Sequence, residues 1–276
     1  MSDLLRIEHV SKAYSTGGPP WRRRRVHALD DVTLTVRAGR TMGLVGESGS
    51  GKSTLGHCVL GLTGVDSGQV VFEGRDIQSL SRVERATFRR RVQPVFQDPY
   101  GSLDPRWPVG RSVRESLDSF RIGTSTDRDK RVLELFDRVG LKSSYASRMP
   151  SQLSGGQRQR VAIAAALASE PELIIADEPV SALDVSVQAQ ILNLFMDLQT
   201  ELGVTSIFIT HDLGVVEHVS DEIAVLYNGV VVETGDVDQV MRAPVHAYTR
   251  TLLDAIPRAD PPEPASGSRT ARPRRH

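Results

Sequence analysis

Apolar and polar residues alternate along two stretches near the start of the chain, residues 4–10 (LLRIEHV) and 32–39 (VTLTVRAG). Successive side chains of a β-strand point to opposite faces, so this alternation predicts half-buried antiparallel strands. Residues 68–77 (GQVVFEGRDI) predict another strand of the same antiparallel part.

Short apolar runs bounded by polar residues follow a second pattern, which is typical of buried parallel strands. Residues 173–177 (LIIAD) and 206–210 (SIFIT) have this pattern, and residues 91–97 (RVQPVFQ) predict a strand that ends at Gln97. Because such strands end at one edge of a sheet, we expect the polar residues that close them to lie along that edge. These residues are Gln97, Asp177 and His211.

From about residue 98 to about residue 158 the chain predicts a helical insertion. Its clearest helix covers residues 127–140 (DRDKRVLELFDRVG), with Gly140 as the natural stop. The apolar residues that share one face of this helix are Val132, Leu135, Phe136 and Val139. Further along, the pair Asn228-Gly229 lies between two β-rich runs and predicts a hairpin.

Two segments are poor in large apolar residues. Residues 15–26 (STGGPPWRRRRV) predict an exposed loop. We favour a solvated charge run for its four arginines, at 22–25, over contact with anionic lipid heads or an acidic partner surface. Residues 257–276 are dominated by proline, serine and arginine, which predicts a disordered tail.

Composition narrows the class of protein. The chain has 276 residues, with 34 basic and 34 acidic side chains, and this balance gives no general reason to expect nucleic-acid binding. Cys58 is the single cysteine, which excludes an internal disulfide and suits a reducing compartment. We see no apolar run near the roughly 18 residues that a membrane span needs and no secretory signal, so we expect a cytoplasmic protein.

A complete phosphate-binding motif follows the apolar run 41–46 (TMGLVG), and we expect a helix from Lys52. Its pattern is G-x-x-x-x-G-K-[ST]. Glycines let the backbone turn tightly, so several N–H groups converge on one anion, and the helix start adds its positive dipole end. We expect Lys52 to reach the β- and γ-phosphates and Ser53 to offer its hydroxyl to Mg²⁺. The predicted nucleotide-binding residues are Gly46, Glu47, Ser48, Gly49, Ser50, Gly51, Lys52, Ser53 and Thr54.

Two carboxylates, Asp177 and Glu178, stand where the run 173–177 ends. Alone they would more often be solvated acids, but a complete phosphate loop in the same chain favours a catalytic interpretation. One carboxylate can hold Mg²⁺ through water, and the next can orient or deprotonate an attacking water molecule. His211, at another strand end, could donate a hydrogen bond to the γ-phosphate.

A second glycine-rich helix start lies in residues 153–167 (LSGGQRQRVAIAAAL). This stretch resembles the signature motif of the ABC ATPases, whose residues here are Ser154, Gly155, Gly156 and Gln157. The companion motifs of that family are present in the same order. The resemblance makes Tyr14 the residue that stacks on adenine, Gln97 the Q-loop glutamine, Glu178 the catalytic glutamate, residues 181–184 (SALD) the D-loop and His211 the switch histidine.

The resemblance covers about residues 3–256 and implies an α/β P-loop NTPase fold, with a mainly parallel sheet core, an N-terminal antiparallel β part and a helical insertion. It implies an ATPase domain at 1–257, with a helical subdomain at about 98–158 and a family extension at about 234–257, before a tail at 258–276. Two such domains pair head to tail, and ATP lies between the phosphate loop of one and the signature helix of the other. ATP and Mg²⁺ are the implied cofactors, and the implied metal-binding residues are Ser53, Gln97 and Asp177.

Two stretches are similar to the ATP-binding subunits of oligopeptide and dipeptide importers. Residues 97–110 (QDPYGSLDPRWPVG) correspond to the surface that docks onto the membrane subunits. Residues 235–257 contain HAYTR, where Ala247 replaces the proline that is usual in this group. Some members hold an iron–sulfur cluster on four cysteines, which this chain cannot do with Cys58 alone.

The resemblance therefore implies an ATPase that energises import at the cytoplasmic face of the membrane. The implied partners are two transmembrane permease subunits, a second ABC ATPase chain and, indirectly, an extracytoplasmic solute-binding protein. The alternatives are an importer of nickel or another small solute, a soluble ABC ATPase and a non-hydrolysing regulator. A single motif set without heptads disfavours the soluble ATPase, and Glu178 and His211 disfavour the regulator.

Overall fold

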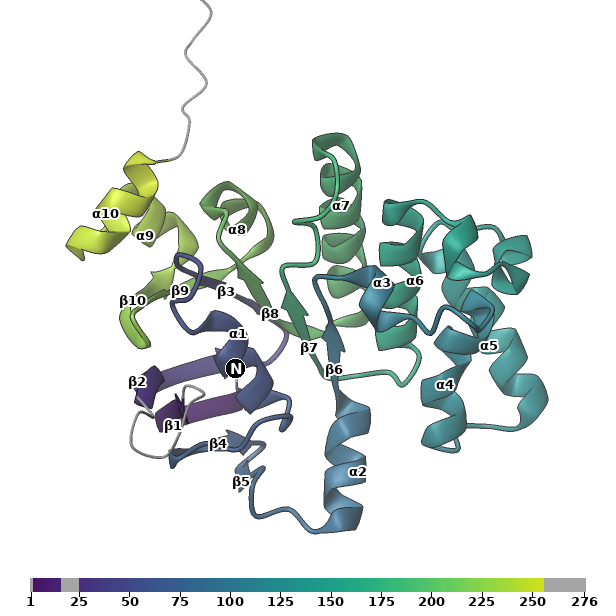
Figure 1. Cartoon of the computed structure of the whole chain (residues 1–276), viewed down its shortest axis with the longest axis horizontal. Helices are drawn as coiled ribbons and strands as arrows, with labels where there is room; N and C mark the ends of the chain where they lie inside the picture. The colour runs from purple at the N-terminus through teal and green to yellow at the C-terminus, as the bar shows by residue number, and fades with distance from the viewer. Residues whose placement is uncertain (1, 16–24, 256–276) are drawn as a thin grey trace, which may run out of the picture.

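The computed structural model describes residues 2–15 and 25–255. Most of the arginine run and the predicted tail lie outside these residues. The described chain forms two β-sheets with helices packed around them (Figure 1). In these ranges no helix is both long and apolar enough to cross a membrane.

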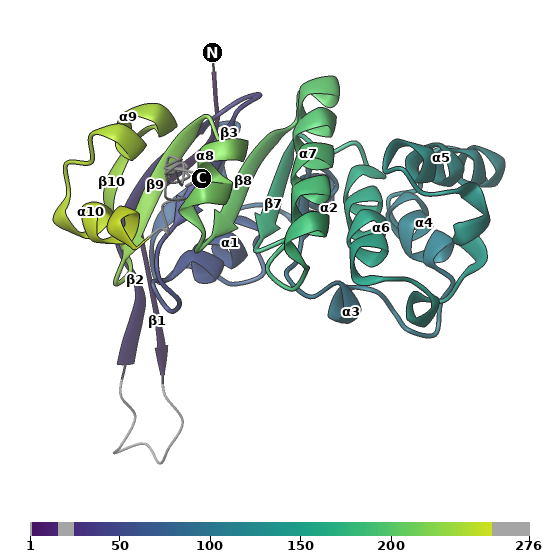
Figure 2. The ribbon, with the colours of Figure 1, turned by 90° about the horizontal axis from the view of Figure 1, so that it is seen from above.

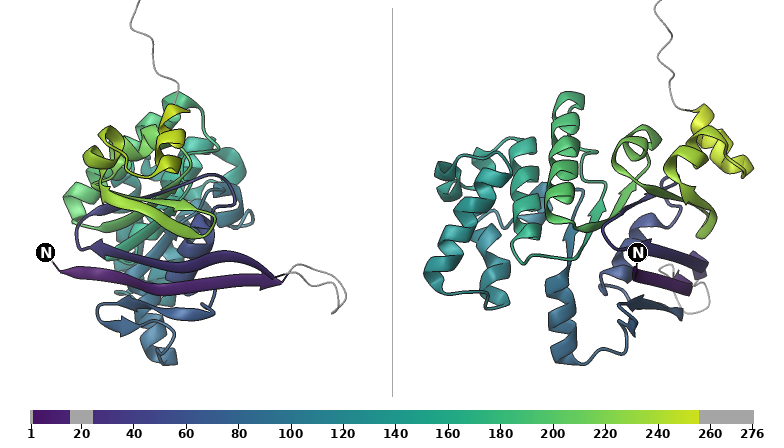
Figure 3. Two further views of the ribbon diagram at one scale, coloured as in Figure 1. Left: turned by 90° about the vertical axis from the view of Figure 1, so that its left-hand side faces the viewer. Right: turned by 180° about the vertical axis from the view of Figure 1, so that it is seen from behind.

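The smaller sheet has the strand order β2-β1-β4-β5, and each strand is antiparallel to its neighbour. The strands are β1 (Asp3–Ser15), β2 (Arg25–Arg37), β4 (Ser67–Phe72) and β5 (Arg75–Asp76). The antiparallel strands predicted from the alternation are confirmed, although β1 and β2 reach 13 residues each. Their exposed ends continue side by side (Figure 3), because backbone pairing such as Tyr14 with Val26 extends the ladder beyond the buried part.

The larger sheet has the strand order β10-β9-β3-β8-β7-β6. Its strands are β3 (Thr41–Val45), β6 (Val92–Val95), β7 (Leu173–Asp177), β8 (Thr205–Thr210), β9 (Glu222–Tyr227) and β10 (Val230–Asp236). All neighbours are parallel except β9 and β10, which form the predicted hairpin. Asn228 and Gly229 turn it with φ of 47° and 82°, the left-handed backbone that a tight hairpin turn requires.

The prediction of a strand that ends at Gln97 is wrong by two residues. Strand β6 ends at Val95, which pairs with Ala176 of β7, and the chain then leaves the sheet. Since β6 is an edge strand, it tolerates Pro94, which has no N–H to donate. Gln97 therefore lies in the connection between β6 and the helix that begins at Pro99.

Helices lie between several of the strands and after β10. They are α1 (Lys52–Val59), α2 (Arg82–Arg91), α3 (Pro99–Ser102), α4 (Val109–Ser119), α5 (Ser125–Arg138), α6 (Gly155–Leu167), α7 (Val185–Leu202), α8 (Leu213–Val219), α9 (Val237–Arg242) and α10 (Ala247–Asp254), with short 3₁₀ turns at Ser143–Ser147 and Pro150–Gln152. Helix α5 confirms the predicted helix: its predicted apolar positions are all buried, and Gly140 just after it has a φ of 69°.

Between β6 and β7 the chain runs through α3 to α6, which lie to one side of the two sheets (Figures 1 and 2). Helix α6 continues to Leu167, beyond the predicted limit at about 158. The division into a domain at 1–257 with its own helical subdomain stays a prediction.

Helix α1 joins the two sheets. Its Leu55 and Val59 are buried in one hydrophobic cluster with Ile7 of β1 and Leu44 of β3. Burial of apolar surface is the main force that fixes such a helix in place. The loop that precedes α1 is thus anchored by both sheets.

Candidate nucleotide site

The predicted phosphate loop connects β3 to α1, as its pattern requires. Gly46, Gly49 and Gly51 have φ of 152°, 82° and 110°, values that L-residues rarely adopt. A Cβ on Gly46 would lie 2.1 Å from the Leu226 carbonyl oxygen, and a Cβ on Gly51 would lie 2.3 Å from that of Ala28. Glycine is therefore required both for the turn and for the close contact with neighbouring backbone.

The start of α1 is left open by its own chain. Gly51 caps the helix in the left-handed conformation, and within the described residues no side chain accepts a hydrogen bond at this cap. The hydroxyl of Ser50 is buried and has no partner in the described chain. Free N–H groups at a helix start together with the dipole form an anion site.

Lys52 lies across the loop and is only 5% exposed. Its Nζ donates to the carbonyl oxygens of Gly46 at 2.7 Å and Glu47 at 2.8 Å. Burial lowers the pKa of Lys52, while the carboxylates of Glu178 and Asp177 act in the opposite direction. This ammonium group thus lies close to the loop and is poorly solvated. Its charge therefore stabilises a bound anion more strongly than the charge of a solvated lysine would.

The two predicted metal-binding side chains nearest to the loop contact each other. Ser53 Oγ donates to Asp177 Oδ1 at 3.2 Å. Burial raises the pKa of Asp177, and the hydrogen bond from Ser53 opposes that shift. A half-buried carboxylate beside a hydroxyl fits a hard cation such as Mg²⁺, which binds oxygen ligands and phosphate together. No cluster of three or more acidic, histidine or cysteine ligands occurs in the described ranges.

Glu178 is the centre of a second group. Its Oε2 accepts from Gln97 Nε2 at 3.2 Å, and its Oε1 lies 3.2 Å from His211 Nδ1. Its side chain is 19% exposed and that of His211 59%. The structure therefore brings together three residues that are far apart in the sequence, at the edge where the strands end.

The backbone of Glu178 is held in an unusual conformation. Its φ is 45°, which costs a non-glycine residue roughly 1–2 kcal/mol. The Glu178 N–H donates to Ile209 O at 2.9 Å, and Ser181 Oγ donates to Glu178 O at 3.1 Å. These bonds hold the strained residue, and strain of this kind is concentrated at functional sites.

Tyr14 lies near the exposed end of β1. Tyr14 is 42% exposed, and Lys12 Nζ lies 5.7 Å from the centre of its ring. An exposed aromatic face can stack on a base, so adenine stacking at Tyr14 stays a prediction.

The predicted signature residues begin α6. Ser154 Oγ accepts from Gln157 N–H at 3.3 Å, and Gln157 Oε1 accepts from Ser154 N–H at 3.0 Å, a reciprocal capping box. A Cβ on Gly156 would lie 2.4 Å from Val187 Cγ1 of α7, so α6 packs closely there. Helices α1 and α6 lie on opposite sides of β7 in two perpendicular views (Figures 1 and 2). The two glycine-rich helix starts are therefore not neighbours within one chain.

One contact to the loop was not predicted from the sequence. The hydroxyl of Tyr248, on α10, accepts a hydrogen bond from Glu47 N–H at 3.0 Å. Gly229 of the hairpin donates to Ser50 O at 2.9 Å. Both contacts join segments that are remote in the sequence, and no local pattern indicates them.

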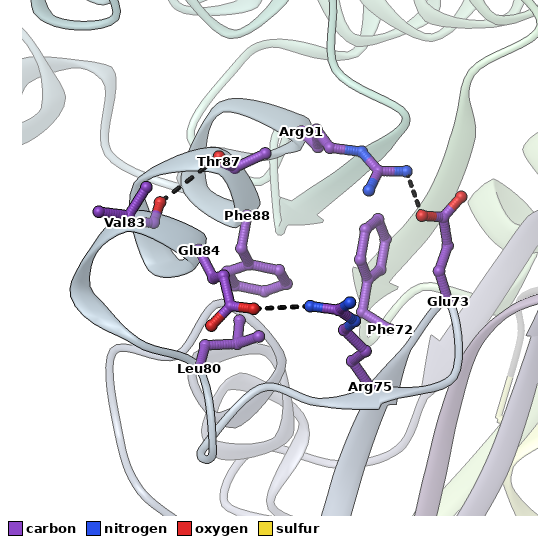
Figure 4. A pocket seen from close by; sticks show the side chains of 9 residues that line it. All are labelled: Phe72, Glu73, Arg75, Leu80, Val83, Glu84, Thr87, Phe88 and Arg91. Carbon is purple, nitrogen blue, oxygen red and sulfur yellow. Dashed lines mark hydrogen bonds and ion pairs between the residues drawn. The ribbon is translucent and has the colours of Figure 1, made fainter.

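Away from the nucleotide site, a hollow of about 360 Å³ lies between the β4–β5 turn and α2 (Figure 4). Its two arginines are already paired: Arg75 with Glu84 at 2.6 Å, and Arg91 with both Glu73 and Glu172. Since the chain itself satisfies these charges, we assign no ligand to this hollow.

The fold and the site define a P-loop ATPase. Comparison with known proteins narrows this class, since residues 29–181 match the ABC transporter family and residues 232–275 match the oligopeptide/dipeptide transporter C-terminal region. The chain belongs to the ABC transporter family, and it is an ATPase that binds and hydrolyses ATP.

Similar proteins include the probable peptide ABC transporter ATP-binding protein y4tS of Sinorhizobium fredii, 49% identical over 95% of this chain and 75% of that protein. The oligopeptide transport ATP-binding protein OppF of Bacillus subtilis is 46% identical over 94% of this chain and 84% of that protein. The chain spans less than half of another relative, OppD of Mycobacterium bovis: 47% identity covers 94% of this chain but 43% of OppD.

Two solved structures are similar in fold and sequence. The ATP-binding cassette MJ0796, a dimer in a post-hydrolysis state with ADP and phosphate, has a TM-score of 0.75 and 33% identity over 84% of this chain and 98% of its own. CbiO1 of Clostridium perfringens, part of the ABC transporter complex cbiONQ, has a TM-score of 0.76 and 30% identity over 88% of this chain and 92% of its own. The predicted fold class is confirmed.

Proposed function

We propose that this ABC ATPase energises an importer of oligopeptides or dipeptides through ATP-driven closure of a pair of ATPase chains. The observation that carries the substrate class is the match of residues 232–275 to the oligopeptide/dipeptide transporter C-terminal region. Relatives that are named as peptide or oligopeptide transport ATP-binding proteins, and that match 94–95% of this chain, support the same class.

The loop residues bind ATP in this proposal. The open start of α1 and the buried hydroxyl of Ser50 offer donors to the phosphates, and Lys52 exchanges its two carbonyl partners for phosphate oxygens. Tyr14 stacks on the adenine. Ser53, Asp177 and Gln97 would hold Mg²⁺, which would supply positive charge beside the phosphates.

Hydrolysis depends on the group around Glu178. Its carboxylate accepts a proton from the attacking water, and the hydrogen bonds from Gln97 and His211 keep that carboxylate in one orientation. The water oxygen bonds to the γ-phosphorus as the bond from that phosphorus to the β–γ bridging oxygen breaks, so ADP leaves and phosphate is released. The carboxylates proposed to bind the metal and to accept the proton, Asp177 and Glu178, are adjacent in the sequence at the end of β7.

A second chain completes the site. Helices α1 and α6 lie on opposite sides of β7, so the signature residues of one chain are available to the phosphate loop of another (Figure 2). The dimeric form of the similar cassette MJ0796 supports such a pair. Whether the mate is an identical or a sister chain is one of the outcomes that co-purification distinguishes.

The membrane subunits dock in a groove of about 540 Å³ beside β6, formed by the segment that follows β6 and by helices α4 and α6. Its floor contains small residues of α6, among them Ala162 and Ala165, which leave room for a helix of a partner. The hydroxyl of Ser112 is buried there without a partner in the described chain. Glu115 is exposed on the wall and has no ion pair with another described residue.

These features fit a permease segment with a basic residue that pairs with Glu115. The proposed location is accordingly the cytoplasmic face of the membrane, against two permease subunits, with a solute-binding protein on the outer side. The residues 97–110 that enter this groove are those whose sequence is similar to the importer subunits.

The test is uptake of a labelled dipeptide by cells that produce this chain with the permeases and binding protein of its own transport system. Glu178→Gln is expected to slow hydrolysis by roughly 10²- to 10⁴-fold and to stop uptake, while ATP binding is kept. Uptake of Ni²⁺ without uptake of the peptide would show that the transported substrate is nickel and not a peptide. A chain that never co-purifies with the permeases would favour the soluble ATPase.

The groove is tested in the same system. Glu115→Arg reverses the charge on the groove wall and is expected to reduce the permease recovered with the chain several-fold. Asp137→Arg makes the same change on α5, at another exposed carboxylate, and is the matched control. Equal recovery with both variants would contradict docking at this groove.

A further inference from the structure

The phosphate loop is in contact with the C-terminal part of the chain through one peptide unit. That unit consists of the Gly46 carbonyl and the Glu47 N–H. Lys52 Nζ donates to the carbonyl at 2.7 Å, and the N–H donates to the Tyr248 hydroxyl at 3.0 Å. Because the C=O and N–H of a trans peptide point in opposite directions, Lys52 and Tyr248 hold the same peptide from its two sides.

The position of Tyr248 is fixed independently of the loop. Its ring packs on that of Tyr227 at a centroid distance of 4.1 Å, just before the hairpin turn. The Glu233 carboxylate of β10 accepts from the N–H groups of Val245 at 2.7 Å and His246 at 2.9 Å, which ties the start of α10 to the sheet. The hydroxyl is therefore carried by a helix, α10, whose position is fixed by other contacts, and a group that positions a binding site needs such support.

The hydroxyl is suited to accept a hydrogen bond at physiological pH. Burial raises the pKa of Tyr248, so the phenol stays neutral. Glu47 N–H, already bound by it, is not one of the donors left for phosphate. The hydrogen bond from Glu47 N–H to Tyr248 fixes the orientation of the peptide. It thereby also fixes the Gly46 carbonyl, which accepts from Lys52 in the absence of ATP.

We propose that Tyr248 is a positioning residue of the ATP site, through which the C-terminal extension holds the Gly46–Glu47 peptide in the orientation that the phosphate loop needs. Without the hydroxyl this peptide can rotate, and a rotation moves the Gly46 carbonyl away from Lys52. ATP must then order the loop as it binds, which weakens affinity. The inference rests on ATP binding alone and not on peptide import.

The test compares the two tyrosines of the stacked pair. Tyr248→Phe keeps the ring and its packing but removes the acceptor, and is expected to weaken ATP affinity about three- to tenfold. The KM for ATP should rise by a similar factor, with kcat at saturating ATP within about twofold. Tyr227→Phe is the matched control, since no described residue forms a hydrogen bond with the Tyr227 hydroxyl, and it is expected to leave ATP affinity unchanged.

Affinity is measured by titration of the purified full chain with ATP, together with the number of sites and the melting temperature. A purely structural role would lower the melting temperature or the number of active sites without a change of affinity. Equal ATP affinities for Tyr248→Phe and the wild type, in folded protein, would overturn the proposal, as would an equal loss for both tyrosine variants.

A double-mutant cycle locates the effect at the peptide. Glu47→Pro has no N–H at this position, so the Tyr248 hydroxyl has nothing to accept there. In that background Tyr248→Phe is expected to change ATP affinity less than twofold. The same several-fold loss in both backgrounds would place the action of the hydroxyl elsewhere and contradict the mechanism.

Discussion

Two helices of this chain start with glycine-rich sequence, and their first N–H groups are in opposite states. Helix α1 begins after Gly51, whose φ is 110°, and no described side chain caps it. Helix α6 begins after Ser154, whose hydroxyl caps it in a reciprocal pair with Gln157. One helix start is open, and the other is already satisfied by its own side chains.

The difference shows that glycine serves two purposes here. In the phosphate loop it allows a left-handed backbone that turns N–H groups toward an anion. In the signature stretch Gly156 is helical, and its missing Cβ makes room for Val187 of α7. The open start therefore has N–H groups available for an anion, whereas the first N–H groups of α6 are already bound by its own side chains.

The largest expected effect concerns the open start. Lys52→Ala removes charge-assisted hydrogen bonds worth about 1.5–3 kcal/mol, so ATP affinity should fall roughly 10- to 150-fold. Equilibrium titration with ATP measures this loss. Lys130→Ala, at an exposed lysine of α5, is the control for loss of one charge. Wild-type ATP affinity in Lys52→Ala would contradict the claim that Lys52 binds ATP at the open start of α1.

The second effect separates a glycine that the backbone requires from a glycine in an ordinary helical turn. Gly51→Ala puts a Cβ at a φ of 110° and 2.3 Å from the Ala28 carbonyl oxygen, so it should cost about 2 kcal/mol or more of unfolding free energy. Gly155→Ala meets only Leu183 Cδ2, at 3.1 Å, and gains helix propensity, so it should cost less than about 1 kcal/mol. Urea denaturation measures both. Similar costs would show that backbone conformation does not distinguish the two helix starts.

The smallest effect concerns the capped start. Ser154→Ala removes the N-cap and should cost about 1 kcal/mol of stability. It should also lower ATP turnover in the working pair, with the ATP affinity of a single chain unchanged. Thr124→Ala breaks the capping box of α5, which is built in the same way, and is expected to cost as much stability with no loss of turnover. A loss of turnover in both variants would mean that Ser154 acts through stability alone.

Much of the fold could be predicted, because its signals are local. The alternation of residues 4–10, the turn at Asn228-Gly229 and the apolar face of α5 each depend on neighbours in the sequence. The phosphate loop is equally local, since a tight turn needs glycine at fixed spacing. The grouping of Gln97, Glu178 and His211 was expected only in outline, from strand ends that share one edge.

What could not be predicted depends on tertiary contacts. Tyr248 meets Glu47 only because α10 packs beside the hairpin, and no sequence pattern relates the two positions. The end of β6 was placed two residues too late, since apolar character continues to Phe96 while pairing with β7 stops at Val95. The positive φ of Glu178 has no signal at all in the sequence, because glutamate is not a residue that favours it.

Pro94 has a consequence for the behaviour of the protein at high concentration. It stands in the middle of the four-residue edge strand β6, and a proline offers no donor to an incoming strand. A strand from another molecule therefore cannot form a continuous hydrogen-bond ladder with β6, which disfavours edge-to-edge aggregation at this edge of the sheet. On the opposite flank, helices α9 and α10 follow β10 and lie next to it (Figure 1). Both edges of the larger sheet are thus poor places for a second copy of the chain to add a strand.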